Sequence, residues 1–442
     1  MTRRVVVDTG PLARVEGEGS LSIVDTGKEG PEVRLNIFEP PRFFEAFLRG
    51  RRAEEVPDLV SRICGICPVA YQISSLNALE WLFGVEVDEQ VRRLRRLLYY
   101  GEWIESHALH VFMLAAPDFV GAPDAMALAE RDPGLVKEAL ALKRLGNSLM
   151  SAIGGREIHP VSLKIGGMYR APSKEALWSI LPEIDRLRGS VRNMVAFVSS
   201  LQRPSLERES TLVCLHDPAR YAIDGGEIIS NGGLCVPPSS FEESFEEYQV
   251  SYSNALHSRT KGGGSYMVGP LARFSLNYEQ LNPVARDMAR DIGLKQPLND
   301  PFQSILVRVL EIAHALEEAA GDVREYVEPV RSSTPYKPKA GVCYGVSEAP
   351  RGILYHSYTV NARGQIERAK IVPPTAQNQS RMEDDIRLLA PQIMKSDADG
   401  ARRLGEMAVR NYDPCISCAT HFLRLDIQKA QPRFPRTPSP RP

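Results

Sequence analysis

No stretch of the 442-residue sequence approaches eighteen uninterrupted apolar residues, the length needed for a membrane-spanning helix. The N-terminus also lacks a signal-peptide pattern, since two arginines lead into a strand-like run that Asp8 interrupts. Net charge is nearly absent, with 54 basic residues against 55 acidic ones, which argues against a nucleic-acid surface or a polybasic membrane anchor. We therefore expect a cytoplasmic protein that neither inserts into a membrane nor binds nucleic acid.

The sequence also lacks internal repeats, a convincing linker, and any low-complexity stretch before the C-terminal end. These absences argue against several separate domains. The chain is long enough, with 43% hydrophobic residues, to bury one substantial core. Its periodicity predicts a mostly α (α+β) fold, a large helical domain with small β-sheets near the N-terminus and in the C-terminal third. We expect long helices at 88–114, 173–202, 300–327 and about 399–411, and strands at 4–8, 20–38 and 341–374 with a hairpin through "NARG".

Seven cysteines are present, an odd count that does not favour a disulfide framework. Four of them form two CxxC pairs near opposite ends of the chain, in "RICGIC" (62–67) and "DPCISC" (413–418). Pro68 follows the first pair and opens a helical pattern, and cysteines at a helix N-terminus have lowered pKa values that favour the metal-binding thiolate. This arrangement favours metal or redox chemistry in a reducing compartment.

The spacing alone leaves three interpretations open. Two CxxC pairs can form a structural zinc site, but such pairs usually lie roughly 15–20 residues apart, whereas almost the whole chain separates these two. Closing so long a loop costs about 5 kcal/mol, so the fold must position the site rather than grow from it. A thioredoxin-like motif is less favoured, because neither pair lies in a strand–CxxC–helix unit. A functional metal site is the preferred interpretation.

Five separated segments resemble the motifs of the large, catalytic subunit of nickel–iron hydrogenases, and together they span nearly the whole chain. Details of "EWIESHALH" and of the "DPCISC…H" ending most resemble the cytoplasmic bidirectional, NADP-linked branch (group 3b), which includes the sulfhydrogenases. The five segments are "ARVEGEG" (13–19), "PPRFFEAFLRGR" (40–51), "RICGIC" (62–67), "EAPRGILYH" (348–356) with "VPPT" (372–375), and "DPCISCATH" (413–421).

The resemblance implies that four thiolates hold a nickel–iron centre. Cys64 and Cys415 would be terminal nickel ligands, and Cys67 and Cys418 would bridge to an iron that carries CO and CN ligands. Soft thiolates suit these metals. Hydrogen would be split heterolytically there, with the proton passed to a base.

The resemblance also assigns roles around that centre. Glu16 would relay protons, and Arg351, with Pro350 beside it and Asp413 as its neighbouring acid, would lie over the metals. Without the resemblance, these would be read as a solvated strand carboxylate, a hairpin arginine and a turn aspartate. Further implied residues are Glu45, the backbone carbonyl of Lys370 and His421 as ligands of a Mg²⁺ ion, and Ile66 and Leu114 along the gas route.

Some positions depart from the family pattern. Tyr71 stands where a histidine is common, Ser106 where another branch has an aspartate, and Pro374 where a Ser or Thr binds cyanide. Thr375 is a candidate to supply the lost donor. His107 and His110 have the i,i+3 spacing of a metal pair, but packing or hydrogen-bonding roles are favoured over metal binding.

The chain has no evident route for the electrons released from hydrogen. Cys214, Cys235 and Cys343 are scattered and match no iron–sulfur pattern, and the Gly-rich "TKGGGSY" lacks the strand–helix context of a nucleotide site. We therefore expect an obligate iron–sulfur small subunit and further flavin, NAD(P) and iron–sulfur electron-transfer subunits. The alternatives are a hydrogen-sensing or energy-converting hydrogenase relative and, in another class, a zinc-stabilised scaffold without catalysis.

The C-terminal segment raises a separate expectation. In the family, an endopeptidase acts after the histidine that corresponds to His421, once nickel-insertion proteins have loaded the site. The stretch 422–442 begins apolar and ends rich in proline and arginine, a composition that favours extended disorder. We therefore divide the chain into a hydrogenase large-subunit domain at 1–421 and a maturation tail at 422–442. A permanent tail is the alternative.

Overall fold

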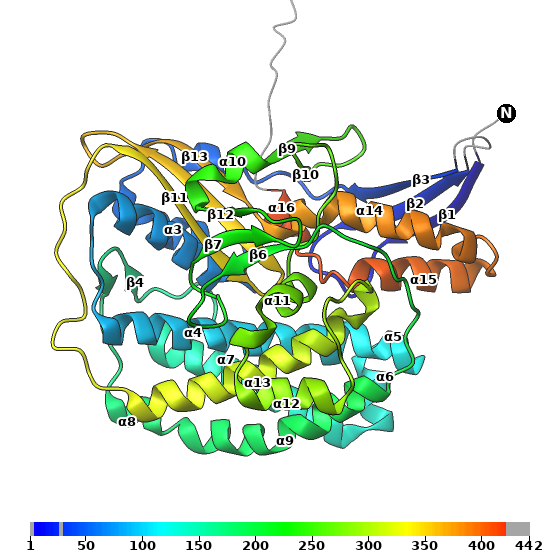
Figure 1. Ribbon diagram of the computed structural model, residues 1–442, viewed down its shortest axis with the longest axis horizontal. Helices are drawn as coiled ribbons and strands as arrows, with labels where there is room; N and C mark the ends of the chain where they lie inside the picture. The colour runs from blue at the N-terminus through cyan, green and yellow to red at the C-terminus, as the bar shows by residue number, and fades with distance from the viewer. Residues whose placement is uncertain (1–3, 26–29, 421–442) are drawn as a thin grey trace, which may run out of the picture.

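The computed structural model describes residues 4–25 and 30–420. Long helices lie side by side along one part of an elongated body, and small antiparallel sheets lie along the other (Figure 1). The mostly helical α+β fold class is therefore confirmed. The long helices are α4 (Glu89–Ala108), α7 (Pro133–Gly154), α9 (Leu181–Ser200) and α13 (Ser304–Glu325), with α3 (Pro68–Phe83) and α14 (Pro374–Ile393) packed beside the sheets.

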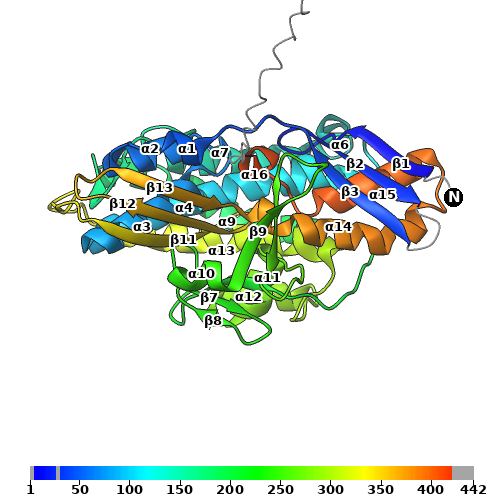
Figure 2. The ribbon, with the colours of Figure 1, turned by 90° about the horizontal axis from the view of Figure 1, so that it is seen from above.

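Within the described residues the sheets are antiparallel, and the three largest have three strands each. The predicted hairpins at 20–38 and through "NARG" are confirmed as β2–β3 and β12–β13. Figure 2 shows β7 and β8 on one side of the long body. The three sheets are β1 (Arg4–Pro11), β2 (Gly19–Asp25) and β3 (Pro31–Ile37); β6 (Val213–His216), β7 (Glu227–Ser230) and β8 (Cys235–Val236); β11 (Gly341–Ala349), β12 (Gly352–Val360) and β13 (Ile366–Val372).

Short elements connect these parts. Those near the metal-binding motifs are α1 (Phe44–Phe47), α2 (Val56–Ser61), the π-helix η2 (Leu109–Ala115), α5 (Ala116–Val120), α15 (Ala398–Arg410) and α16 (Ile416–Ala419). The others are η1 (Ala53–Glu55), α6 (Ala125–Arg131), β4 (Leu163–Lys164), β5 (Gly167–Met168), α8 (Lys174–Trp178), η3 (Pro238–Ser240), α10 (Phe241–Ser244), β9 (Phe245–Gln249), β10 (Leu256–Thr260), α11 (Pro270–Asn277), η4 (Tyr278–Gln280), α12 (Pro283–Asp291) and η5 (Pro301–Gln303).

Two of the predicted helices are interrupted. The helix expected at 173–202 is split into α8 and α9, because Pro182 lies in the first turn of α9 and cannot continue a preceding helix. The helix expected at 88–114 begins as predicted, with the Asp88 side chain accepting from the amides of Gln90 and Val91. It then continues as the π-helix η2, a form often found beside functional sites.

The core is built from the apolar faces of these elements. Apolar side chains of α4 and η2 are buried in it, among them Leu94, Leu98, Ile104 and Phe112. Within the described residues, no single helix has the length and apolar composition to cross a membrane. The segment Glu89–Val120 and helix α6 meet those criteria only when joined, and they are bent by 73° at their junction.

A glycine sets the distance between α4 and α7. A Cβ atom added at Gly146 would lie 2.5 Å from the carbonyl oxygen of Gly101 and 2.8 Å from the backbone nitrogen of Glu105. Because both atoms belong to the α4 backbone, a Gly146→Ala substitution should push the helices apart and cost about 1–3 kcal/mol of unfolding free energy. Thermal unfolding of the purified protein measures this loss.

The matched control is Gly189→Ala in the exposed face of α9, where an added Cβ atom meets nothing within 4 Å. This change should be neutral or stabilise by up to about 1 kcal/mol, because alanine has the higher helix propensity. Equal effects of the two substitutions would contradict the packing argument.

Candidate metal centre

The first cysteine pair lies in the loop between α2 and α3. Cys67 is the N-cap of α3 and Pro68 its first residue, as predicted. The Cys64 sulfur accepts hydrogen bonds from the backbone amides of Ile66 at 3.3 Å and Cys67 at 3.2 Å. These amide bonds favour a negatively charged sulfur in a tight loop.

The second pair follows α15. Asp413 has a left-handed backbone conformation (φ 53°), which turns the chain between α15 and Cys415, the N-cap of α16. The Cys415 amide donates to the Thr375 hydroxyl oxygen at 3.0 Å. Thr375 therefore holds the backbone of the second pair, and its role as a cyanide donor stays a prediction.

Arg42 joins the two cysteine loops. Its guanidinium donates to the carbonyl oxygen of Ile63, at 2.7 Å, and to that of Ser417, while its backbone amide donates to the carbonyl oxygen of Thr420. One side chain thus bonds to backbone on both sides of the centre. Sequence reasoning did not single out this arginine.

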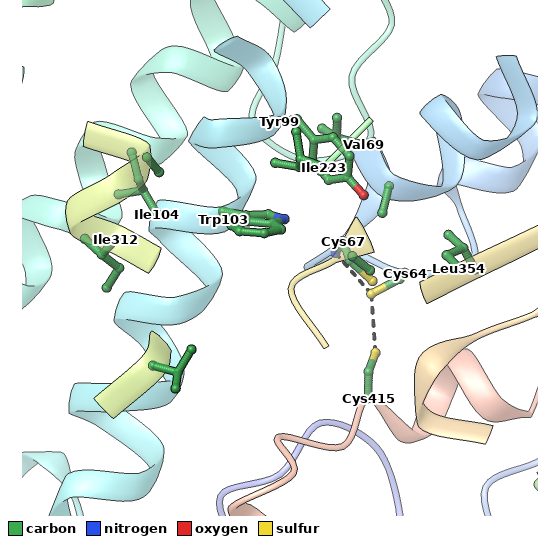
Figure 3. Close-up of a cluster of buried hydrophobic side chains, with 14 of the residues drawn as sticks. Cys64, Cys67, Val69, Tyr99, Trp103, Ile104, Ile223, Ile312, Leu354 and Cys415 are labelled. Atoms are coloured by element: carbon green, nitrogen blue, oxygen red, sulfur yellow. Dashed lines mark hydrogen bonds between the residues drawn. The ribbon is translucent and has the colours of Figure 1, made fainter. Parts of the chain in front are cut away.

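The four sulfurs converge in the interior. All lie within 4.8 Å of one another, and every one of the four residues is at most 3% exposed. Cys64 faces Cys415 at 3.4 Å, Cys67 faces Cys418 at 3.7 Å, and Cys415 lies 2.8 Å from Cys418. In Figure 3 a dashed line joins Cys64 to Cys415, and Cys67 lies next to Cys64. In the described part of the chain this is the one cluster of at least three such side chains with metal-ligand geometry.

The chemistry of this donor set fits a soft metal. Burial raises the pKa of Cys415 and opposes ionisation of Cys64 as well, but hydrogen bonds from the neighbouring thiols and the Arg351 charge lower the pKa of Cys64 overall. The pKa values of the other three thiols, Cys67, Cys415 and Cys418, are raised, so these three resist ionisation. A soft metal cation would stabilise the thiolates and release their protons.

Arg351 lies beside the cysteines, held by Asp413. Its Nε donates to the Asp413 carbonyl oxygen at 2.6 Å, Nη2 pairs with the Asp413 carboxylate at 3.0 Å, and Nη1 donates to the Ser106 hydroxyl at 3.2 Å. Burial opposes the charge of both groups. Even so, their mutual attraction raises the pKa of Arg351 and lowers that of Asp413. The Arg351 guanidinium therefore stays positively charged and is held in a fixed orientation.

Buried charged residues that the sequence did not reveal hold the turn that carries Arg351. The fully buried Arg273 donates to the carbonyl oxygens of Ala349, at 3.0 Å, and Pro350, at 2.9 Å, on the turn that carries Arg351. It pairs with Glu311 at 2.7 Å and lies 4.4 Å from the Trp103 ring. In the sequence "PLARFSLN", this residue looks like the polar face of an ordinary helix.

The two histidines of α4 and η2 are hydrogen-bonded within the protein. His107 Nε2 lies 2.9 Å from Glu311, and His110 Nε2 lies 2.7 Å from the Arg410 carbonyl oxygen. Burial lowers the pKa of His107 to about 4 and that of His110 to about 3, so both rings are neutral near pH 7. These contacts favour the packing and hydrogen-bonding interpretation over a metal pair.

Glu16 meets the second cysteine pair from the other end of the chain. Its carbonyl oxygen accepts from the Ile416 amide at 3.0 Å, forming a parallel bridge with Cys415. Its carboxylate accepts from the Ser417 amide at 3.1 Å. Burial raises the pKa of Glu16. The backbone and the side chain of Glu16 are thus both anchored to the loop that holds Cys415.

The residues expected at a magnesium site are partly brought together. Glu45, on α1, is buried, and its carboxylate accepts from the Ile371 amide at 2.8 Å. Glu45 and Lys370 line the same pocket. His421 lies outside the described residues. Ile66 is partly buried and packs against the core, and the Leu114 carbonyl oxygen accepts a hydrogen bond from Arg14 at 2.5 Å. The role of these two residues along the gas route stays a prediction.

The sequence matches one family model, that of nickel-dependent hydrogenases, over residues 42–137 and 239–421. It is 36% identical to sulfhydrogenase 2 subunit alpha of Pyrococcus furiosus, over 95% of this chain and 100% of that protein. It is 34% identical to sulfhydrogenase 1 subunit alpha of the same organism, over 94% of this chain and 97% of that protein.

A solved structure supports the same assignment. The fold matches an NAD⁺-reducing [NiFe]-hydrogenase in the H2-reduced state with a TM-score of 0.85 and 27% identity, over 95% of this chain and 100% of that one. These relatives do not favour the sensing, energy-converting or zinc-scaffold alternatives. The chain belongs to the nickel-dependent hydrogenase family and is the catalytic large subunit of a nickel–iron hydrogenase, an oxidoreductase that acts on hydrogen.

Proposed function

We propose that Cys64, Cys67, Cys415 and Cys418 hold a nickel–iron centre with CO and CN ligands on the iron. Cys64 and Cys415 would bind nickel terminally, and Cys67 and Cys418 would bridge to iron. The observation that carries this proposal is the convergence of four buried sulfurs from both ends of a chain of this family. When bound, the metals would supply a soft Lewis-acidic site for heterolytic cleavage of hydrogen.

We assign the surrounding polar groups to orientation and proton movement. Arg351, oriented by Asp413 and Ser106, would present its N–H donors to the iron's cyanide ligands and to hydrogen at the metals. Glu16 would take and return the proton, because its carboxylate lies against the loop that carries Cys415 and remains partly accessible. Buried apolar side chains around the cluster would keep bulk water out.

We further propose a Mg²⁺ ion bound by the Glu45 carboxylate, the Lys370 carbonyl and His421. A carboxylate and a carbonyl are hard oxygen donors of the kind magnesium prefers, and imidazole is a less usual partner. The Ile371 amide donates a hydrogen bond to the Glu45 carboxylate, which places this carboxylate against β13, the strand that contains Lys370. The ion would tie α1 and β13 to the end of the catalytic domain.

Electron transfer requires partners. Cys214 and Cys343 are buried apart from the centre, and Cys235 is exposed, so the described residues offer no iron–sulfur ligand set beside the four-cysteine cluster. One relative is the beta subunit of an NAD-reducing hydrogenase of Cupriavidus necator, 27% identical over 96% of both chains. We propose an iron–sulfur small subunit, then flavin, NAD(P) and further iron–sulfur subunits, in the cytoplasm.

Metal analysis and infrared spectroscopy of the purified complex test this function. We expect nickel and iron in equal amounts in this chain and infrared bands of bound CO and CN that change when hydrogen is added. Zinc alone, without such bands, would contradict the nickel–iron assignment and support a structural site.

Maturation gives a second test. We propose that an endopeptidase removes 422–442 after nickel-insertion proteins have loaded the site, so that active enzyme ends at His421. At the mean residue mass of a 49.1 kDa chain of 442 residues, processing lowers the intact mass by roughly 2.3 kDa. Intact mass spectrometry of active, nickel-loaded enzyme measures this. A fully active chain that still carries Pro442 would contradict it.

A further inference from the structure

Asp118, on α5, is a buried carboxylate shared by two arginines from opposite ends of the chain. It is 3% exposed, and its Oδ1 lies 2.5 Å from Arg14 Nη2 and 3.0 Å from Arg410 Nη2. Its Oδ2 lies 2.7 Å from Arg410 Nε. We call Asp118, Arg14 and Arg410 the Asp118 clamp. No step assigned above uses it.

One arm of the clamp holds the segment that carries Glu16. Arg14 has a left-handed backbone conformation (φ 58°), which is strained for a residue with a side chain and persists only where the surroundings enforce it. Its guanidinium is anchored to Asp118 and to the Leu114 carbonyl oxygen. Arg410 Nη1 also donates to the Ala13 carbonyl oxygen at 2.8 Å. The chain is therefore fixed just before Glu16.

The other arm holds the segment that carries the second cysteine pair. Arg410 is the last residue of α15, and its carbonyl oxygen accepts from the Asp413 amide at 2.8 Å and from His110. Cys415 follows two residues after Asp413. The two arms meet again where Glu16 bonds to the amides of Ile416 and Ser417.

The charge balance makes Asp118 indispensable to this arrangement. The Arg410 side chain is 2% exposed and that of Arg14 is 18% exposed. Without Asp118, Arg410 would still pair with Glu406 at 3.1 Å. The Arg14 guanidinium, in contrast, would keep only the Leu114 carbonyl oxygen as a partner. An Asp118→Asn amide would also direct its NH₂ donors at an arginine. Losing the carboxylate leaves two cations side by side in a poorly solvated site.

We propose that Asp118 is a positioning residue that sets the Glu16 carboxylate against the Cys415 loop. This proposal rests on the assigned role of Glu16 as proton relay. Small displacements of a reacting group are costly, on the order of 10²-fold in rate for about 1 Å. Loss of the clamp should therefore slow turnover because Glu16 is displaced, and not because the metals are lost.

The test compares Asp118→Asn and the milder Arg14→Gln in the assembled enzyme, each alone and combined with Glu16→Gln. Each single clamp variant should keep its nickel and lose about 10²-fold in hydrogen turnover. In the Glu16→Gln background, the same change should cost less than about twofold further, because both changes act on one step. Glu279→Gln, which breaks an exposed ion pair with Arg286, is the matched control and should match wild type.

Hydrogen exchange supplies a second readout that does not depend on activity. Both clamp variants should speed amide exchange in peptides covering 12–19 and 411–419, and the control variant should not. Equal fold losses with and without Glu16→Gln, or unchanged exchange at 12–19, would overturn the role of Asp118. Full turnover in Glu16→Gln alone would instead overturn the relay assignment, and with it the reason to position Glu16.

Discussion

A Cys67→Ser protein should lose hydrogen turnover completely and retain far less nickel. Soft metals select thiolates, and a serine hydroxyl is a harder ligand that stays protonated at neutral pH. Cys67 is the N-cap of α3, a position that serine occupies readily, so the fold should survive the exchange. Metal analysis and hydrogen uptake on the same preparation measure both losses. The effect then reports on ligand chemistry and not on unfolding.

Cys235→Ser is the control for this change, since that thiol is exposed on β8 and lies outside the cluster. It should have normal nickel content and turnover. Cys418→Ser should behave like Cys67→Ser, because the two sulfurs face each other at 3.7 Å. Normal nickel and normal turnover in Cys67→Ser would remove Cys67 from the metal site.

The cysteine cluster was predictable because each half of it is local. A CxxC pair followed by proline and helical spacing indicates a thiolate pair at a helix start, and the first pair does precede α3, with Cys67 as its N-cap. In the second pair Cys415 is the N-cap of α16 and Cys418 lies inside that short helix. Cys64 and Cys415 are 351 residues apart. The two CxxC pairs favoured a shared metal site, but the identity of the metals and the role of each thiolate came only from the family resemblance.

The residues that orient the site were missed for a physical reason. Arg308 and Glu311 lie on α13 in a pattern that predicts a solvated helix face, yet both are at most 1% exposed. Arg308 pairs with Asp413 at 3.2 Å, and Glu311 pairs with Arg273. A buried charge needs a partner, and here each partner comes from another part of the chain. No periodicity in one segment reveals it.

The prediction of helix boundaries failed for a simpler reason. We predicted one helix through Pro182, although proline removes a helix hydrogen bond and clashes with the preceding turn, and the structure breaks there between α8 and α9. The π-helix η2 carries no such mark. Its ends are held by long-range bonds, from His110 to the Arg410 carbonyl oxygen and from Arg14 to the Leu114 carbonyl oxygen, and these exist only in the folded chain.

A Glu16→Gln enzyme should keep its metals and lose hydrogen turnover by about 10²–10⁴-fold. The glutamine amide oxygen can still accept from the Ser417 amide, and the backbone bridge between Glu16 and Cys415 does not involve the side chain. The local structure should therefore persist. What disappears is a carboxylate that exchanges protons, since an amide neither gains nor loses one near neutral pH.

Two hydrogen assays on one preparation separate proton transfer from cleavage. Hydrogen uptake requires the proton to leave, whereas conversion of para- to ortho-hydrogen requires cleavage without release to solvent. Glu16→Gln should lower the first far more than the second and leave the CO and CN bands in place. Glu18→Gln, an exposed residue of the same "EGEG" stretch, should match wild type in both assays. If Glu16→Gln takes up hydrogen at the wild-type rate, Glu16 is an ordinary half-buried carboxylate in the connection between β1 and β2, and the proton leaves by another group.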